Sequence, residues 1–202
     1  MSNLQGKVVL ITGAGKGRGR ILAKAFAERG ALVAANDISP INVEQVVDEI
    51  NQLGGHAKAY IEDIAKKVGV QNLVNQVDDE FGRIDVLINH AAVQPNAPLL
   101  EMDEWDWHRV LDVNLTGAFL VTQSVGRVMR AQGGGAIIHL VTGSVRDERK
   151  EAAFVASMSG LEAFARQAAR ELSPHGIQVF GLRNEQSSVV KDVLALFDME
   201  AK

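Results

Sequence analysis

The stretch Thr12-Gly13-Ala14-Gly15-Lys16-Gly17-Arg18-Gly19 decides the fold of this chain. It follows a short β-branched run, Lys7 to Ile11, that is typical of a buried strand, and it precedes an amphipathic helix expected over Ile21 to Arg29. Glycines let a backbone approach a pyrophosphate without a Cβ clash, and the next helix offers unpaired N–H groups and a favourable dipole. This context predicts a dinucleotide-binding βαβ unit; the alternative is a tight turn that holds no ligand.

The same alternation of apolar runs and amphipathic stretches continues along the chain. Further strands are expected at residues 31–35, 57–61, 84–88, 136–141 and 177–182, and helices at 43–53, 68–81, 103–130, 152–172 and 189–197. Asp103 is the expected N-cap of the longest helix. Six strands joined by right-handed crossovers predict a Rossmann-like, doubly wound parallel α/β sheet with helices on both faces, and one domain spanning 1–202.

Composition narrows the class of function. The formal net charge is −4, which offers no basic face for nucleic acid or an anionic membrane. There is no cysteine, so disulfides, thiol nucleophiles and thiolate metal sites are excluded, and the histidines show no metal-ligand spacing. The first residues are too polar for a signal peptide, and no apolar run approaches the roughly 18 residues of a membrane helix. We therefore expect a cytoplasmic protein without a bound metal.

An acidic residue ends the second predicted strand. Asp37 lies 18 residues beyond Gly19 (37 − 19), and a carboxylate near that separation accepts hydrogen bonds from the adenosine ribose hydroxyls. Its charge would repel a 2′-phosphate, so the pattern favours NAD over NADP. Lys16 and Arg18 act against this preference, because either cation attracts a phosphate. The other interpretation of Asp37 is a turn or cap residue.

The glycine-rich turn is followed by three further segments, at 63–64, 89–92 and Asn114, and with them the chain resembles the short-chain dehydrogenase/reductase family from about residue 4 to residue 177. Asp63-Ile64 resembles its adenine-contacting pair, and Asn89-His90-Ala91-Ala92 resembles its Asn-Asn-Ala-Gly segment with two positions changed. Asn114 matches an asparagine of the family's catalytic set. The resemblance, together with the glycine-rich turn, implies a set of cofactor-binding residues: Gly13, Gly15, Lys16, Gly17, Arg18, Gly19, Asp37, Asp63, Ile64, Asn89 and Ala91.

The resemblance implies hydride transfer by a Ser, Tyr and Lys that follow the fifth strand. In the family the Tyr moves the alcohol proton, the Lys lowers the Tyr pKa and holds the nicotinamide ribose, and the Ser bonds the substrate oxygen. Here Phe154 and Met158 stand at the Tyr and Lys positions, and Thr142 stands at the Ser position, with Ser144 as a second candidate. Phe has no ionisable proton and Met has no charge, and losing a general acid costs about 10²- to 10⁴-fold in rate. Asn114 and Thr142 are the catalytic residues that we expect to remain.

A second departure lies near the C-terminus. The family has Pro-Gly after the sixth strand, followed by a loop that covers the substrate and a seventh strand. Residues 179–185 contain no Pro-Gly, and we expect only one short helix at 189–197 after them. The chain therefore resembles a C-terminally shortened member. Its single tyrosine, Tyr60, lies on the third predicted strand and cannot take the catalytic position.

Three hypotheses for function follow. The first is a catalytically impaired, NAD(H)-binding pseudoenzyme that acts as a scaffold or NAD(H)-responsive interaction protein. The second is an active NAD(P)-dependent oxidoreductase on an alcohol or carbonyl, with a displaced proton donor: His90, His139, or a water held by Asn114 and Thr142. The third is a degraded remnant that does not fold stably, against which the apolar patterning argues.

Other side chains have more ordinary interpretations. His90 and His139 are expected at strand ends as simple hydrogen-bonded residues, and the charged run at 146–151 as a solvated loop. Of Trp105 and Trp107, one is expected in the core and the other at an interface. Broad apolar faces on the helices at 103–130 and 152–172, which form the oligomer contacts in the resembling family, predict a homo-oligomer.

Overall fold

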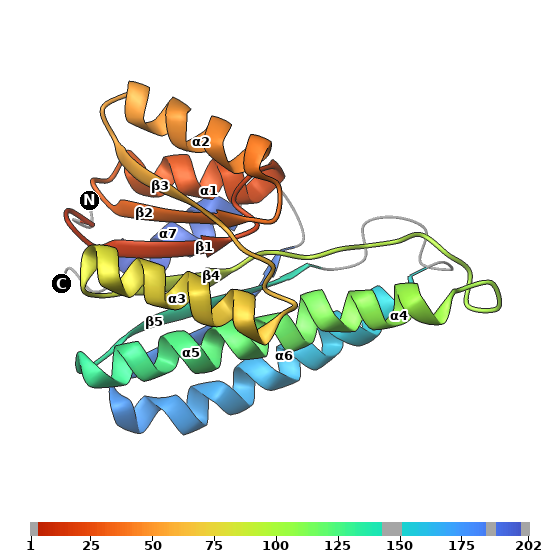
Figure 1. The fold of residues 1–202 in the computed structure, drawn as a ribbon. Helices are drawn as coiled ribbons and strands as arrows, with labels where there is room; N and C mark the ends of the chain where they lie inside the picture. The colour runs from red at the N-terminus through yellow and green to blue at the C-terminus, as the bar shows by residue number, and fades with distance from the viewer. Residues whose placement is uncertain (1–3, 143–150, 185–188, 199–202) are drawn as a thin grey trace.

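The computed structural model describes residues 4–142, 151–184 and 189–198, and within them six parallel strands form one sheet (Figure 1). The strands are β1 (Val8–Thr12), β2 (Leu32–Asp37), β3 (His56–Ile61), β4 (Val86–Asn89), β5 (Gly135–Thr142) and β6 (Ile177–Asn184). Their order is β3-β2-β1-β4-β5-β6. The predicted Rossmann-like fold is confirmed, and the point where the strand order reverses lies between β1 and β4.

Helices cover both faces of this sheet. They are α1 (Gly17–Ala27), α2 (Pro40–Gln52), α3 (Lys67–Phe81), α4 (Glu104–Leu111), α5 (Ala118–Ala131), α6 (Ala152–Leu172) and α7 (Val189–Asp198), with a single-turn 3₁₀ helix at Ser173–His175. Figure 1 shows α1, α2 and α7 on one face and α3, α5 and α6 on the other. Two large apolar clusters lie between these helices and the sheet.

The central strand shows why the core divides this way. Val9 and Ile11 belong to the cluster under α1 and α2, whereas Val8 and Leu10 belong to the cluster under α3 and α5. All of β1 is buried. A strand buried on both faces carries a continuous apolar run, which is the pattern that made this strand predictable from sequence.

The predicted helices differ most from the structure at three places. Helix α1 begins at Gly17, inside the glycine-rich turn, and α2 begins at Pro40, directly after Ser39. Proline is favoured at the first position of a helix because its missing N–H has no partner there in any case. The predicted helix at 103–130 is interrupted by a π-helical segment, η1, at Asp112–Gly117. Its predicted cap is confirmed, since the Asp103 Oδ1 accepts a hydrogen bond from the Trp105 N–H at 2.7 Å.

Some side-chain predictions were wrong. Neither tryptophan lies in the core: Trp105 is 63% exposed and Trp107 is half-buried. His139 lies inside β5 and is fully buried, instead of standing at its end. Ser144 and positions 146–150 of the charged run lie outside the described residues. No helix in the described ranges has both the length and the apolar character needed to cross a membrane.

Candidate functional site

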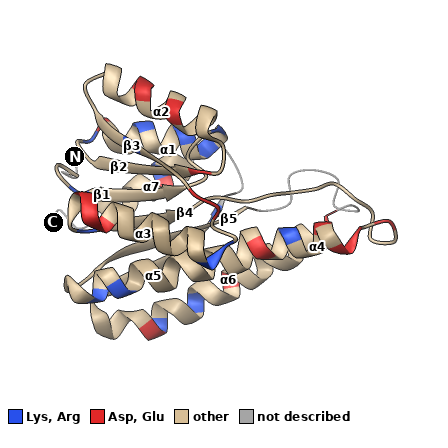
Figure 2. Ribbon diagram, viewed as in Figure 1, with Lys and Arg blue, Asp and Glu red and all other residues tan. Residues whose placement is uncertain are grey.

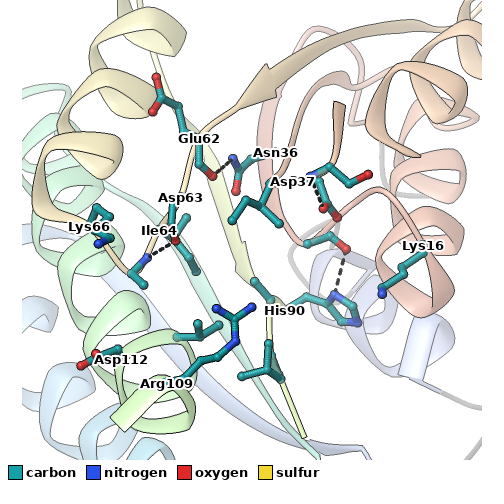
Figure 3. A pocket seen from close by; sticks show the side chains of 18 of the residues that line it. Lys16, Asn36, Asp37, Glu62, Asp63, Ile64, Lys66, His90, Arg109 and Asp112 are labelled. Atoms are coloured by element: carbon teal, nitrogen blue, oxygen red, sulfur yellow. Dashed lines mark hydrogen bonds between the residues drawn. The ribbon is translucent and has the colours of Figure 1, made fainter. Parts of the chain in front are cut away.

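A cavity of about 530 Å³ opens at the carboxyl ends of the central strands. Figure 3 shows side chains converging on it from the loops after β1, β2, β3 and β4 and from α4. Six of the predicted cofactor-binding residues line it, as does His90: the six are Gly13, Lys16, Asp37, Asp63, Ile64 and Ala91. In a doubly wound sheet this edge is where ligands bind.

Three glycines of the glycine-rich turn are packed so closely that a Cβ would have no room. A Cβ on Gly13, whose φ is 68°, would lie 2.8 Å from the Cα of Ala91. A Cβ on Gly15 would lie 2.8 Å from Asp37 Oδ2, and one on Gly19 would overlap the Gly13 carbonyl. Gly17 faces open space and begins α1. The loop thus presents bare backbone at a helix N-terminus, which is the arrangement that fits the pyrophosphate of a dinucleotide.

The carboxylate of Asp37 supports this turn while lining the cavity. Its Oδ2 accepts a hydrogen bond from the Gly15 N–H at 2.9 Å, and its Oδ1 accepts one from the Ser39 N–H at 3.0 Å. Asp37 therefore does act as a turn residue, because its carboxylate accepts these two backbone N–H groups. It does not exclude the ribose interpretation, because each carboxylate oxygen accepts more than one hydrogen bond.

The loop after β4 is tied to the loop after β1. Thr12 Oγ1 accepts hydrogen bonds from the N–H groups of His90 and Ala91, at 3.1 and 3.2 Å. The His90 Nδ1 lies 3.2 Å from the Gly13 carbonyl oxygen, which only accepts, so Nδ1 carries the proton (Figure 3). Burial lowers the pKa of His90, and the hydrogen bond to Gly13 opposes that shift. A neutral His90 keeps a lone pair on its other ring nitrogen, Nε2.

The opposite wall of the cavity comes from the loop after β3 and from α4. Asp63 Oδ1 accepts a hydrogen bond from the Ala65 N–H at 3.0 Å, and Ile64 is buried beside it. Asn36 Nδ2 donates to the backbone carbonyls of Tyr60 and Glu62, each at 3.1 Å, which holds this loop against β2. The sequence analysis missed several lining residues: Asn36, Glu62, Lys66, Trp105, His108, Arg109 and Asp112. Those from α4 and η1 had no local signal, because only tertiary packing brings α4 over the strands.

Asn89 is turned away from the cavity. Its Nδ2 donates to Thr122 Oγ1 at 3.1 Å and lies 3.3 Å from His139 Nδ1. Burial lowers the pKa of His139 to about 4, so this ring is neutral at physiological pH. His139 Nε2 and Asn89 Oδ1 have no hydrogen-bond partner in the described part of the chain. The three side chains form a buried polar cluster behind the site.

Phe154 and Met158, at the positions where the family resemblance places Tyr and Lys, lie in an apolar cluster. Phe154 and Met158 are 3% and 5% exposed and pack with Ala118, Val141 and Leu161 in a small apolar core. Thr142 ends β5 and is half-buried. None of Phe154, Met158, Thr142 and Asn114 is among the residues that line the cavity.

Asn114, on η1, is occupied by other parts of the protein. Its Oδ1 accepts a hydrogen bond from the Val93 N–H at 2.8 Å. Its Nδ2 donates to the Val93 carbonyl and to Ser157 Oγ, each at 3.0 Å. The amide thus joins the loop after β4 to α6.

Charges are mixed over the molecule, with basic residues at two helix starts that border the cavity (Figure 2). Lys16 precedes α1, and Lys66 precedes α3. Acidic residues lie between them at Asp37, Glu62 and Asp63. The cavity therefore offers both anion-binding and diol-binding groups.

The strand order, the glycine-rich turn that opens α1 and the cavity across the strand ends define a dinucleotide-binding α/β protein. A family model described as short chain dehydrogenase matches residues 7–184. The chain belongs to this family of oxidoreductases.

Among curated relatives, an uncharacterized oxidoreductase of Thermotoga maritima is 42% identical over 138 residues, covering 68% of this chain and 54% of the relative. A 3-oxoacyl-[acyl-carrier-protein] reductase of the same organism is 37% identical, covering 87% of this chain and 72% of the relative. A D-threitol dehydrogenase of Mycolicibacterium smegmatis is 36% identical, with coverages of 87% and 68%. The chain thus spans about half the length of the first relative and more of the others.

Solved structures of short-chain dehydrogenases and oxidoreductases are also similar to this chain. An NAD⁺-bound xylitol dehydrogenase superposes with a TM-score of 0.85 at 30% identity, covering 95% of this chain and 75% of that one. A metagenomic short-chain oxidoreductase in complex with NADP gives a TM-score of 0.89 at 29% identity, with coverages of 96% and 91%. One of these structural relatives thus contains NAD⁺ and the other contains NADP.

Proposed function

We propose that this chain binds NAD(H) at the cavity and that its proton-transfer apparatus is lost. The observation that carries the proposal is the buried apolar cluster around Phe154 and Met158, at the positions that the family resemblance gives to Tyr and Lys. Neither side chain donates a proton or carries a charge. A catalytically impaired, dinucleotide-binding protein is the function that this arrangement supports best.

In this proposal the glycine-rich turn binds the pyrophosphate of the dinucleotide, and the cavity binds its adenosine. The bare backbone at Gly13, Gly15, Gly17 and Gly19 accommodates the pyrophosphate, with Lys16 and Arg18 supplying positive charge. Asp37 accepts hydrogen bonds from the adenosine ribose, while Asp63, Ile64 and Ala91 border the adenine. Asn89 contributes from behind by holding β4. We assign NAD rather than NADP because the Asp37 carboxylate at the ribose repels a 2′-phosphate.

The bound cofactor would supply or accept a hydride; the chain's own residues decide whether a proton moves as well. Thr142 keeps a hydroxyl that can bond a carbonyl oxygen. Asn114 is committed to Val93 and Ser157. Phe154 has no proton to give to a developing alkoxide. Loss of a positioned acid lowers rates by about 10²- to 10⁴-fold, and positioning alone sustains what remains.

The alternative is an active NAD(P)-dependent oxidoreductase with a displaced proton donor. One observation favours His90 as the residue that moves the proton: it lines the cavity, and when Nδ1 donates to the Gly13 carbonyl its Nε2 lone pair can accept the proton that an alcohol loses on oxidation. Only after taking up that proton could Nε2 donate one in the direction of carbonyl reduction. His139 is a poor candidate, because it is fully buried and its pKa is lowered to about 4.

We also propose that the chain forms a homo-oligomer through its two long helical segments and folds as one domain. A groove of about 350 Å³ between α5 and α6, lined by Phe119, Phe164 and Leu172, supports self-association there. A sedimentation mass equal to that of the monomer would refute it. The cytoplasmic location stays a prediction.

The experiment is a titration of the purified chain with NADH, NAD⁺ and NADPH, followed by nicotinamide fluorescence and thermal unfolding. Ligand binding raises stability by RT ln(1 + [L]/Kd), so modest affinity is measurable. We expect NADH to bind more tightly than NADPH. Absence of binding at millimolar cofactor would refute the proposal.

Catalysis is tested with a panel of aldehydes, ketones and alcohols at high protein concentration. We expect no robust NADH-dependent turnover. Robust turnover would contradict impairment, and its loss in His90→Asn, with NADH binding retained, would establish the displaced donor.

A further inference from the structure

A cation occupies the part of the cavity that faces the loop after β3. Arg109 extends from α4, and Figure 3 shows its guanidinium reaching between Ile64 and His90. Lys16 and Asp37 lie on the other side of the same view, next to the glycine-rich turn. In a dinucleotide bound as proposed above, Arg109 therefore lies next to the adenine. It lies farther from the ribose and the phosphates.

The guanidinium is held by a neighbouring ring. The Arg109 Cζ lies 5.3 Å from the centroid of the Trp105 ring, one helical turn earlier on α4. Residues four apart on a helix share a face, so α4 itself sets this contact. Within the described ranges no hydrogen bond or ion pair of the Arg109 guanidinium is found. Its planar group thus has one stacking partner and, among the described residues, no ion-pair partner.

A planar cation backed by an indole suits a purine. Arginine stacks on aromatic faces, whereas lysine is a compact, strongly hydrated point charge without a flat face. Adenine has two π-faces and several ring-nitrogen acceptors, and arginine is a common partner for stacked bases. Trp105 is 63% exposed, so the pair lies at the mouth of the cavity and is accessible to an entering base.

We propose that Arg109 is a positioning residue for the adenine, with its guanidinium stacked between the Trp105 indole and the purine. This inference rests on the proposed NAD(H)-binding function and adds a specificity determinant to it. The nicotinamide half of the ligand takes no part in the contact. The interaction therefore contributes to affinity for any adenylate, including AMP.

Three ligands distinguish the effect of this contact from effects on the rest of the site. They are NADH, AMP and reduced nicotinamide mononucleotide, which has no adenosine. Each is titrated against the unaltered chain, Arg109→Met, Arg109→Lys and Trp105→Leu. Arg170→Met is the matched control, because Arg170 is an exposed arginine on α6 that does not line the cavity. Thermal unfolding of the unliganded proteins checks that each variant folds.

We expect Arg109→Met to weaken NADH and AMP binding about five- to thirtyfold, within the range of base–aromatic and cation–π contacts. Reduced nicotinamide mononucleotide should change by less than about twofold. Arg109→Lys should lose nearly as much as Arg109→Met, since charge without a planar face is insufficient. Trp105→Leu should lose less, and Arg170→Met nothing.

Each contrary result has a distinct meaning. Unchanged or tighter NADH binding by Arg109→Met would overturn the inference while leaving the proposed function intact. Full affinity in Arg109→Lys would show that charge attraction alone is sufficient, which would overturn the stacking. Equal losses for the mononucleotide would show a general structural effect and also overturn it. If the unaltered chain binds neither NADH nor AMP, the proposed function fails first and the inference with it.

Discussion

Asn114 and Ser157, 43 positions apart in sequence, are joined by a hydrogen bond of 3.0 Å from the Asn114 Nδ2 to the Ser157 Oγ. Ser157 Oγ in turn donates to the Phe154 carbonyl at 2.8 Å. This contact connects η1 with the part of α6 where the family resemblance places the Tyr and Lys. The asparagine expected to be catalytic thus has a clear structural role, which leads to the first prediction.

Asn114→Ala should lower the free energy of unfolding by about 2–4 kcal/mol, because it leaves both the N–H and the carbonyl of Val93 without their partner. Urea denaturation measures the change. Ser157→Ala is the control and should lower the free energy of unfolding by only about 1 kcal/mol, since Asn114 keeps both of its hydrogen bonds to Val93. Equal, negligible effects of the two substitutions would show that the network contributes little.

Asp37→Asn should shift cofactor preference. Removing the carboxylate charge relieves repulsion of a 2′-phosphate, so the ratio of the Kd for NADPH to the Kd for NADH should fall about tenfold or more. Fluorescence titration with both dinucleotides gives this ratio. Asp48→Asn, an exposed site on α2 with the same charge change, should leave it constant. A ratio that does not move in Asp37→Asn would exclude Asp37 as the determinant.

Gly15→Ala should disrupt the turn. The new Cβ would lie 2.8 Å from the Asn42 Cβ and from Asp37 Oδ2, and it would displace the carboxylate that accepts the Gly15 N–H. We expect a loss of about 1–3 kcal/mol in unfolding free energy and at least about a tenfold weaker affinity for NADH. Gly126→Ala is the contrast, because its nearest neighbour would be 3.9 Å away in a helix. That substitution should be neutral or stabilise by up to about 1 kcal/mol.

Stability should fall on acidification because of His139. Burial lowers its pKa to about 4 in the folded chain from the ordinary value of 6.5, so the unfolded state binds the proton more readily. The contribution is complete above pH 6.5 and is lost as the pH falls toward 4, amounting to about 3 kcal/mol at most. Unfolding in urea across this range measures it. His139→Gln should flatten the curve, whereas His175→Gln, at an exposed site, should not.

Local patterns were sufficient for the elements that carry their own signal. The continuous apolar run of β1, the glycines that follow it and the Asp103 cap each specify backbone conformation through nearby residues. The parallel sheet and its two helical layers followed from the alternation of strand and helix patterns. Helix starts were less accurate where a proline or a glycine-rich turn began the helix before its apolar face.

Long-range contacts decided the rest. The sequence by itself determined the parallel sheet, the glycine-rich turn, Asp37 at the end of β2, and a Phe and a Met where the family resemblance places ionisable residues. It carried no signal for η1, for the burial of Asn89 and His139, or for Arg109 in the cavity. These depend on how α4, α5 and α6 pack across the sheet, because a side chain's partners are set by neighbours from distant segments rather than by its own helical or strand period.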